Sequence, residues 1–279
     1  MRPPLRTSPT GSLNHANINA LRRWTLDAYN IRYLRIYPTP SYPDTRIVIY
    51  ADLAAMRSVG GEVAIRTAAS TPAFGRTLFT DKTGVGGLDT GKLASNSLYA
   101  IYLVADTASE NGLSSNLGVI ASTDWQNPAL PAGWTHKRLV GAFATKEDES
   151  TGEAVIVPFT QLDDWFIYSE SQVVLHFQNV TEAIKRTPLD IANWMPPVSE
   201  EVHVDAQVIG GNAPFSLKIY EHHTGLEILD LNPGTGDFGH ESVWMFAPRQ
   251  ILDYSVGVNN TVWGEILVLG FRIPINQEF

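Results

Sequence analysis

Short runs of β-branched and aromatic residues, separated by turn-forming residues, constrain this chain more than any other feature. From about residue 31 onward, stretches such as TRIVIYADL, LYAIYLVAD and EILVLGFRIPI alternate with segments rich in Gly, Pro, Asn and Asp. Strand-forming runs at this spacing, without long helical patterns between them, are typical of β-sandwiches and barrels. The sequence therefore predicts an all-β fold.

We expect two antiparallel β-sandwich domains, preceded by an arm that contains a short helix. Residues 202–208 alternate apolar and polar side chains, as an antiparallel strand with one solvent-facing side requires. Only residues 181–195 indicate a short helical or irregular crossover. The predicted parts are an N-terminal docking arm (residues 1–44), a first sandwich (45–163) and a C-terminal sandwich (164–279).

The charge is unevenly distributed along the chain. Residues 1–36 carry six arginines and one acid, a balance of +5, whereas the rest carries −14, which together give the net charge of −9. The acidic body argues against a nucleic-acid partner. A basic arm on an acidic body predicts docking onto an acidic neighbour, with an ordinary solvated terminus as the alternative. The candidate docking residues are Arg2, Arg6, Arg22 and Arg23.

Two absences narrow the possible chemistry. The chain has no cysteine, which excludes disulfides, thiolate metal sites and cysteine nucleophiles. No run approaches the ~18 apolar residues that a membrane span needs, so we expect none. The first residues also lack the apolar core of a secretory signal, and we expect no such signal.

An Asp-Thr-Gly triplet at residues 89–91 matches the motif that carries the catalytic aspartate of aspartic proteases. Those enzymes need two carboxylates about 3 Å apart that share a proton, and this chain has one such triplet, although a dimer could supply the second. Gly87-Leu88 precede the triplet and Lys92 follows it, where the proteases have two apolar residues and a small one. The neighbouring glycines favour a polar turn.

The longer segment around this triplet carries a more specific pattern. GLDTG is followed by a small-residue turn, the strand YAIYLV, a strand ending in Ser122, the segment PALPAGW and the basic pair Lys137-Arg138. This order, over residues 84–145, resembles a module of tailed-bacteriophage virion appendage proteins of the tail-fibre and head-fibre type. The loop at 107–116 departs from that pattern, because it is longer and more polar.

A second, looser likeness lies in the other half of the chain. The segments PLDI, WMPP and EVHV, within residues 188–204, resemble the entry to the C-terminal β-sandwich of the same family. The first 60 residues match no part of it. We expect the core of the resembling module to contain Tyr99, Tyr102 and Trp134.

The resemblance implies a structural protein of a virion, without enzymatic activity and without a cofactor. It implies a homotrimeric tail-fibre or fibre-like appendage subunit that acts by assembly and attachment. Its partners would be copies of itself, virion proteins of tail or head bound through the arm, and a bacterial cell-surface glycan. The alternative is a capsid decoration, collar or adaptor protein without receptor binding. An aspartic protease or glycan hydrolase is a remote alternative.

Histidines and acids in the C-terminal half suggest a metal site. His203 and Asp205 share one face of a predicted strand, and His222 and His223 follow one predicted hairpin later. Imidazole and carboxylate groups suit zinc or a harder divalent ion. The alternative is a solvent-facing sheet surface with ordinary polar residues.

Two further features have a structural and a functional interpretation. Asp163 and Asp164, beside Trp165, could suggest the carboxylate pair of a glycosidase, but adjacent strand residues point to opposite faces, which favours a linker. Aromatic side chains of the C-terminal half could stack on sugar rings, or they could fill the core or a subunit interface. These aromatic residues are Trp194, Tyr220, Phe238, Trp244, Phe246, Tyr254 and Trp263.

Overall fold

The protein is an all-β molecule built from antiparallel β-sandwiches, as the sequence predicts. The computed structural model describes residues 31, 33–51, 53–58, 63–67, 74–106, 116–209, 216–234, 237–257 and 263–275. Within these residues the strands form three sheets, and the regular structure outside them is one short 3-10 helix. The predicted arm helix lies in residues 1–30, outside the described residues.

The N-terminal sandwich packs a sheet in the order β4-β3-β9-β7-β8-β6 against strands β11-β1-β2-β5. Nearly all pairs are antiparallel, and the short β6 pairs with β8 in parallel. The strands are β1 (Arg35–Thr39), β2 (Tyr42–Ala51), β3 (Leu53–Ser58), β4 (Val63–Thr67), β5 (Phe74–Phe79), β6 (Gly87–Leu88), β7 (Leu98–Asp106), β8 (Leu117–Ser122), β9 (Trp134–Glu147), β10 (Ala154–Ile156) and β11 (Phe159–Leu162).

The C-terminal sandwich packs strands in the order β17-β14-β19-β12 against a sheet in the order β13-β18-β15-β16. Its elements are β12 (Trp165–Gln178), β13 (Ile184–Asp190), β14 (Glu201–Ile209), β15 (Ser216–Glu221), β16 (Glu227–Leu231), β17 (Phe238–Phe246), the 3-10 helix η1 (Pro248–Gln250), β18 (Ile251–Gly257) and β19 (Trp263–Arg272).

This strand order is that of a jelly roll. Of the eight strands from β12 to β19, the first pairs with the eighth, the eighth with the third and the third with the sixth. In the facing sheet the second pairs with the seventh, the seventh with the fourth and the fourth with the fifth. Successive strands therefore alternate between the two sheets along most of the chain, as two Greek keys do.

The crossover predicted at residues 181–195 is wrong in its middle part, where strand β13 occupies residues 184–190, and the residues on either side of the strand are irregular as predicted. The charges and the proline obscure the strand pattern in this segment. Pro188 lacks an N–H group, but β13 lies at the edge of its sheet, where one side of the strand has no ladder partner. A strand with proline is therefore tolerated here.

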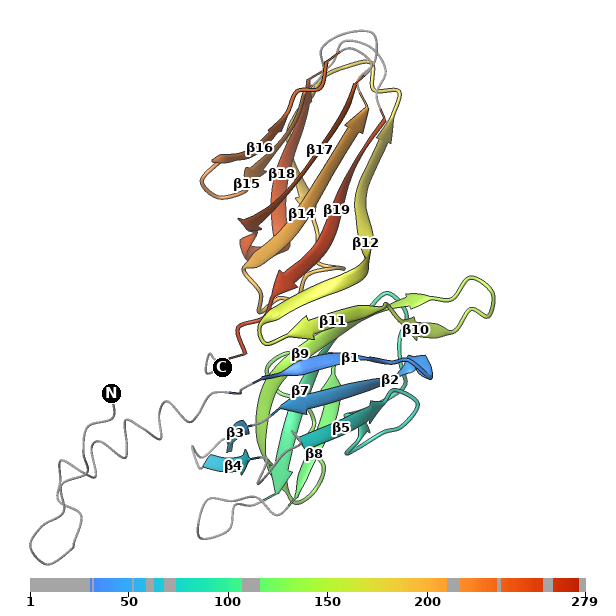
Figure 1. Ribbon diagram of the computed structural model, residues 1–279, viewed down its shortest axis with the longest axis vertical. Coiled ribbons are helices and arrows are strands. Elements are labelled where there is room, and N and C mark those ends of the chain that lie inside the picture. Colours follow the sequence, from blue (N-terminus) through green and yellow to red (C-terminus); the bar gives the residue numbers. More distant parts are fainter. Residues whose placement is uncertain are drawn as a thin grey trace, which may run out of the picture.

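Strand β12 joins the two sandwiches into one continuous sheet. Its residues 165–168 pair with β11 on one side, while β12 pairs with β19 on the other, with a register shift between Ile167 and Gln172. The eight strands β17-β14-β19-β12-β11-β1-β2-β5 consequently form a single sheet. Figure 1 shows β11 and β12 side by side where the lower sandwich meets the upper one.

The predicted boundary at residues 163 and 164 falls in the tight turn between these two strands. Asp163 has a φ of 52° there, and its carboxylate accepts a hydrogen bond from the backbone N–H of Leu34. Residues 35–44, in the range predicted as the arm, form β1 and the start of β2, and Ile36 is fully buried. The chain therefore enters the sheet next to the turn that joins the sandwiches.

Aromatic side chains fill the core on both sides of this junction. Phe166 of β12 stacks on Phe159 of β11 at 4.7 Å and on Phe271 of β19 at 4.2 Å between ring centroids. Tyr168 adds an edge contact to Phe166 at 4.9 Å. Because this stack contains residues of both sandwiches, the hydrophobic core is continuous across the junction.

Candidate functional site

The Asp-Thr-Gly triplet forms a turn whose aspartate holds a distant loop. One oxygen of Asp89 accepts a hydrogen bond from the N–H of Thr90 at 2.7 Å, and the other accepts one from the N–H of Ala129 at 3.0 Å. Ala129 belongs to the PALPAGW segment, 40 residues further along the chain. The carboxylate therefore joins two loops that both lie within residues 84–145.

The three residues expected in the module core lie around the same loops. Tyr99 is buried, stacks on Phe143 at 5.0 Å and accepts a hydrogen bond from the N–H of Ala94. Tyr102 is buried as well, and burial raises its pKa far above the usual tyrosine value. Trp134 is half-buried and packs against the core. All three side chains contribute packing to the N-terminal sandwich.

Asp124 orders the loop that precedes the PALPAGW segment. Its carboxylate accepts hydrogen bonds from the N–H groups of Gln126 at 2.9 Å and of Asn127 at 2.7 Å. These two backbone bonds hold the pKa of Asp124 below its usual range. With the bonds of Asp89, they satisfy the backbone of an exposed, proline-containing loop that has no ladder partners of its own.

The four predicted metal ligands are not brought together. His203 and Asp205 lie on β14 in the eight-stranded sheet, whereas His222 and His223 follow β15 in the four-stranded sheet. The prediction assumed that β14 and β15 form a hairpin, but in a jelly roll these successive strands belong to opposite sheets. Among the described residues, no group of three or more His, Asp or Glu side chains is placed to hold a metal ion.

Each of these side chains has another partner. The His203 ring stacks on Trp244 at 4.7 Å, and burial lowers the pKa of His203. The buried carboxylate of Asp205 pairs with His240 Nε2 at 2.7 Å and accepts a bond from Gln207. These contacts stabilise the outer face of β14 and its neighbour β17.

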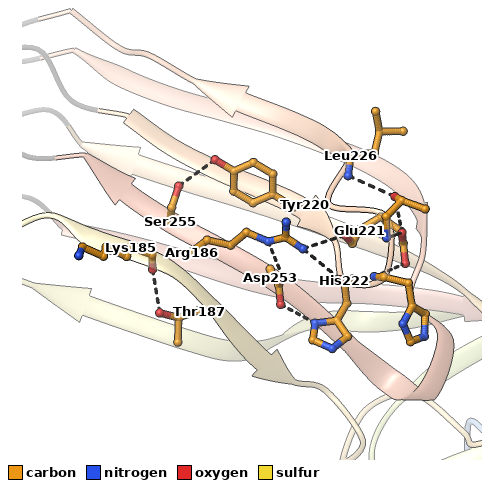
Figure 2. A network of polar contacts seen from close by, with 11 residues as sticks. Lys185, Arg186, Thr187, Tyr220, Glu221, His222, Leu226, Asp253 and Ser255 are labelled. Atoms are coloured by element: carbon orange, nitrogen blue, oxygen red, sulfur yellow. Dashed lines mark hydrogen bonds and ion pairs between the residues drawn. The ribbon is translucent and has the colours of Figure 1, made fainter.

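His222 belongs to a polar network that ties together β13, β15 and β18 (Figure 2). The buried carboxylate of Asp253 pairs with Arg186 Nε at 2.5 Å and with His222 Nδ1 at 2.6 Å. Arg186 also donates to the carbonyl oxygen of His222 at 3.0 Å. Pairing offsets the desolvation cost that the buried carboxylate of Asp253 would carry alone, and both of its oxygens are engaged within the chain.

Glu221 orders the adjacent turn. Its carboxylate accepts hydrogen bonds from the N–H groups of His223 at 2.9 Å and of Thr224 at 2.6 Å, and from the Thr224 hydroxyl. The Thr224 hydroxyl bond and the His223 amide bond are the leading causes that lower the pKa of Glu221 to about 2. The turn ends at Gly225, whose φ of +70° favours glycine.

The surface best suited to binding lies on the outer face of the eight-stranded sheet, where the sandwiches meet. The register aligns Leu162, Trp165, Arg272, Glu201 and Phe246 in one row across five strands. In the next row of the same face lie Ile167, Gly270, His203 and Trp244. We call these nine residues the junction surface.

Large apolar side chains on the junction surface are open to solvent. Their exposed fractions are 53% for Leu162, 41% for Trp165, 39% for Ile167 and 56% for Phe246. The rings of Trp165 and Trp244 meet edge to face at 4.6 Å. Contiguous exposed apolar side chains are a common feature of interaction sites.

A charged group is held at the centre of this apolar surface. The guanidinium of Arg272 lies 5.1 Å from the Trp165 ring centroid, pairs with Asp164 at 2.7 Å and pairs with Glu201 at 3.2 Å. The hydrogen bonds to Asp164 and then to Glu201 raise the pKa of Arg272. Tryptophan and arginine together are enriched at the centres of protein interfaces.

Sequence reasoning missed this surface because its residues come from four separate segments of the chain. Trp244 and Phe246 were noted as aromatic residues, but Leu162, Ile167 and Arg272 carried no visible signal.

The predicted docking residues Arg2, Arg6, Arg22 and Arg23 lie outside the described residues. In the part of the chain that the structure describes, there is no helix long and apolar enough to cross a membrane.

Comparisons with known proteins give weak likenesses. No protein-family model and no curated protein matches the chain. The chain is similar to the insecticidal delta-endotoxin Cry8Ea1 from Bacillus thuringiensis, with a TM-score of 0.24 and 10% identity, over 86% of this chain and 52% of that one. It is also similar to the T13 viral particle of infectious bursal disease virus, with a TM-score of 0.24 and 10% identity, over 87% and 66%.

A third similar structure is an exo-beta-1,3-galactanase from Phanerochaete chrysosporium, with a TM-score of 0.23 and 9% identity, over 85% of this chain and 56% of that one. The chain spans about half to two thirds of the length of these three proteins. Likenesses at such TM-scores carry no argument about what the chain does.

Proposed function

We propose that the chain is a structural subunit of a tailed-phage virion. The observation that carries this proposal is the arrangement of the residues that resemble phage appendage proteins. Asp89 and the PALPAGW loop form one unit, over a core containing Tyr99 and Tyr102, and their polar atoms bind backbone groups. Because the polar side chains of this unit are hydrogen-bonded to its own backbone, the unit is suited to a role in assembly.

The jelly roll of residues 165–272 agrees with this proposal. Double-sheet jelly rolls are a common architecture of viral capsid domains and also of lectins and cupins. The fold class alone does not select among these functions. Together with the resemblance of residues 84–145, it favours the virion role over the other two.

In its finer form, the proposal is a homotrimeric tail-fibre or fibre-like appendage that acts by assembly and attachment. The N-terminal sandwich is then the trimerising shaft or shoulder, and the jelly roll is a knob or a platform for the next component. The basic residues of the arm dock onto a virion neighbour of tail or head, and attachment uses a bacterial cell-surface glycan. Symmetry multiplies weak contacts into avidity.

The junction surface favours a second candidate, a capsid decoration, collar or adaptor protein without receptor binding. Its exposed leucine, isoleucine and phenylalanine side chains fit a protein partner better than a sugar. In addition, Arg272 lies over Trp165, and His203 stacks on Trp244. Both tryptophans are therefore already in contact with groups of the chain itself, which leaves less ring surface for stacking on a glycan.

Enzymatic function has little support among the described carboxylates. Asp89 is engaged by two backbone N–H groups. Asp163 accepts a bond from Leu34 N–H, and Asp164 pairs with Arg272. These three acids have separate structural partners, whereas a protease or glycosidase needs two that converge on a substrate.

Two experiments test the proposal. Gradient-purified virions of the encoding virus are analysed by mass spectrometry and labelled with gold-conjugated antibody against this chain. The proposal expects the chain in the particle and gold on the tail or on the head surface. A chain found only in infected-cell lysate would overturn it.

In a second assay, recombinant protein is added to host cells before infection, and blocked adsorption selects the attachment role over the decoration role.

Light scattering of the full chain and of residues 31–279 tests the trimer and the arm. The truncation stops before Ile31, because Ile31, Leu34 and Ile36 are buried in the N-terminal sandwich. A mass of three subunits, or of a multiple of three, in both forms supports a fibre held by its sandwiches with the arm as a docking device. A monomer in both forms excludes the stable trimer and favours the decoration or adaptor role.

A further inference from the structure

The three sheets end in edge strands, and most of these edges are blunted against pairing with another chain. Strand β13 carries Pro188, which has no N–H group, and β6 has two residues. On β5, Arg76 Nε donates to the carbonyl oxygen of Leu117 in the facing sheet. Proline, very short strands and coverage by neighbouring groups are recognised means of protecting an edge.

The β16 edge is protected by charge. Glu227 and Asp230 of this strand both pair with Lys218 of β15, at 2.9 and 3.0 Å. Charged side chains along an exposed strand disfavour pairing with a second strand, because the charges would lose water in the contact.

Strand β17 has one of these devices, the exposed charge of Glu241, and lacks the others. It has nine residues, contains no proline and no lysine, and pairs with β14 over its whole length on one side. Among the described residues, no backbone hydrogen bond joins β17 to a strand on its other side. Its two end residues, Phe238 and Phe246, are 59% and 56% exposed. A long edge with aromatic ends is therefore open to a partner strand.

The outward side chains of β17 repeat in a symmetrical order. The register with β14 places alternate residues on the outer face of the sheet, and these are Phe238, His240, Ser242, Trp244 and Phe246. Ser242 is the middle residue of the strand and is exposed. An aromatic residue stands at each end, and a ring-bearing side chain stands two positions from the middle on each side.

This order is self-complementary when two copies run antiparallel. With a two-fold axis at Ser242, Phe238 of each copy lies opposite Phe246 of the other, and His240 lies opposite Trp244. All nine residues are paired in this register. Directly opposed side chains on one face of an antiparallel pair are in contact range, and aromatic pairs are among the favourable ones. A two-fold contact of this kind uses the same patch on both copies.

The charges of the strand are compatible with the same register. The acid of β17 is Glu241, which would lie opposite Val243 of the second copy and not opposite a like charge. His240 already pairs with Asp205 of its own chain at 2.7 Å. The two-fold arrangement therefore places no two acids and no two bases directly opposite each other, although the two Glu241 side chains become diagonal neighbours, about 7–8 Å apart.

We propose that two copies of this chain associate by antiparallel pairing of their β17 strands about a two-fold axis at Ser242. Each eight-stranded sheet then continues into that of the other copy, and Trp244 and Phe246 of the junction surface lie at the contact. This contact goes beyond the proposed virion role and does not depend on it. It joins copies in pairs, so it yields dimers or, combined with a trimer, assemblies with an even number of subunits.

A single engineered cysteine tests the register directly. Since the chain has no cysteine, the variant Ser242→Cys contains one thiol per subunit. Directly opposed strand residues have Cα atoms about 4.5–5.5 Å apart, within the range that a disulfide spans. We expect oxidised Ser242→Cys to form a covalent dimer on a denaturing gel. Far-UV circular dichroism first verifies that each variant is folded.

Two control variants distinguish cross-linking in the proposed register from cross-linking by random collision of subunits. In His240→Cys the thiol lies on the same strand and face, but its counterpart in the second copy is four residues away, roughly 14 Å along the strand. Thr160→Cys places an exposed thiol on β11 of the same sheet, away from the edge. We expect at least tenfold faster cross-linking of Ser242→Cys than of either control. Equal rates in all three variants would overturn the proposal.

Light scattering of the unmodified full chain gives the independent readout. We expect an even multiple of the 30.7 kDa subunit mass, and we expect Ser242→Asp, which opposes two carboxylates at the axis, to weaken association at least tenfold. A monomer at 100 µM or a plain trimer would contradict the proposal, as would a mass unchanged by Ser242→Asp. The virion assays above do not measure this contact, so either proposal can fail alone.

Discussion

The replacement Phe271→Ala tests whether the two sandwiches form one cooperative unit. Phe271 lies on β19 of the C-terminal sandwich and is fully buried. Its ring stacks on Phe166 at 4.2 Å, and Phe166 in turn stacks on Phe159 of the N-terminal sandwich at 4.7 Å. Removing the ring therefore opens a cavity in the part of the core that both sandwiches share.

The expected cost is large. Truncation of a buried phenylalanine to alanine destabilises a protein by about 3–5 kcal/mol, which includes the cavity left behind. For a chain of this size each kcal/mol lowers the melting temperature by roughly 2–4 °C. We therefore expect the melting temperature to fall by roughly 6–20 °C.

Scanning calorimetry, with urea unfolding followed by circular dichroism and tryptophan fluorescence, measures this effect. We expect a single transition in the parent chain and a single transition, shifted to lower temperature, in Phe271→Ala. The matched control is Leu226→Ala, whose side chain is 62% exposed and whose loss should stay within about 0.5 kcal/mol. Two resolved transitions, of which one keeps the parent temperature, would refute the shared core.

Three further outcomes are expected. Asp89→Ala frees the N–H of Ala129 and should cost about 1 kcal/mol, measured by urea unfolding, with faster hydrogen exchange at that amide. The pKa of Glu221 is lowered from 4.5 to about 2, so its ionised carboxylate stabilises the fold above pH 4.5, and this contribution is lost as the pH falls through about 2. In urea titrations between these pH values, the parent chain should therefore lose more stability than Glu221→Gln. In Gly141→Ala the new methyl group would lie 2.5 Å from the Gln161 side chain, so the urea midpoint should fall by the equivalent of about 1–3 kcal/mol.

Strands with a strong pattern were predicted well from the sequence. The segment LYAIYLVAD is strand β7, residues 98–106, and EVHVDAQVI is strand β14, residues 201–209. In these segments the side chains are sufficient to predict a strand and its buried face. An apolar run, or a strict alternation of apolar and polar residues, has one burial pattern that removes its apolar side chains from water. Strand β13 was missed, since Lys185, Arg186 and Pro188 conceal an edge strand that its neighbour β18 stabilises.

The candidate sites were also predictable from the sequence only in part. Asp89 was correctly placed in a turn, because its glycine neighbours are visible in the sequence. Its bond to Ala129 and the pairing of Asp253 with Arg186 and His222 were not predictable. Each joins residues tens of positions apart, and local patterns carry no information about such partners.

The sequence by itself determined that this chain is a β-protein, where most of its strands lie and which residues form its turns. These properties depend on side chains only a few residues apart, and burial and turn geometry act over that range. Which strands become neighbours was decided by the tertiary structure alone. Strand β12 extends the sheet of one sandwich into the other, and β14 and β15 separate into opposite sheets. The junction surface and the open edge of β17 exist because packing of the whole chain selects one strand order among many with the same local patterns.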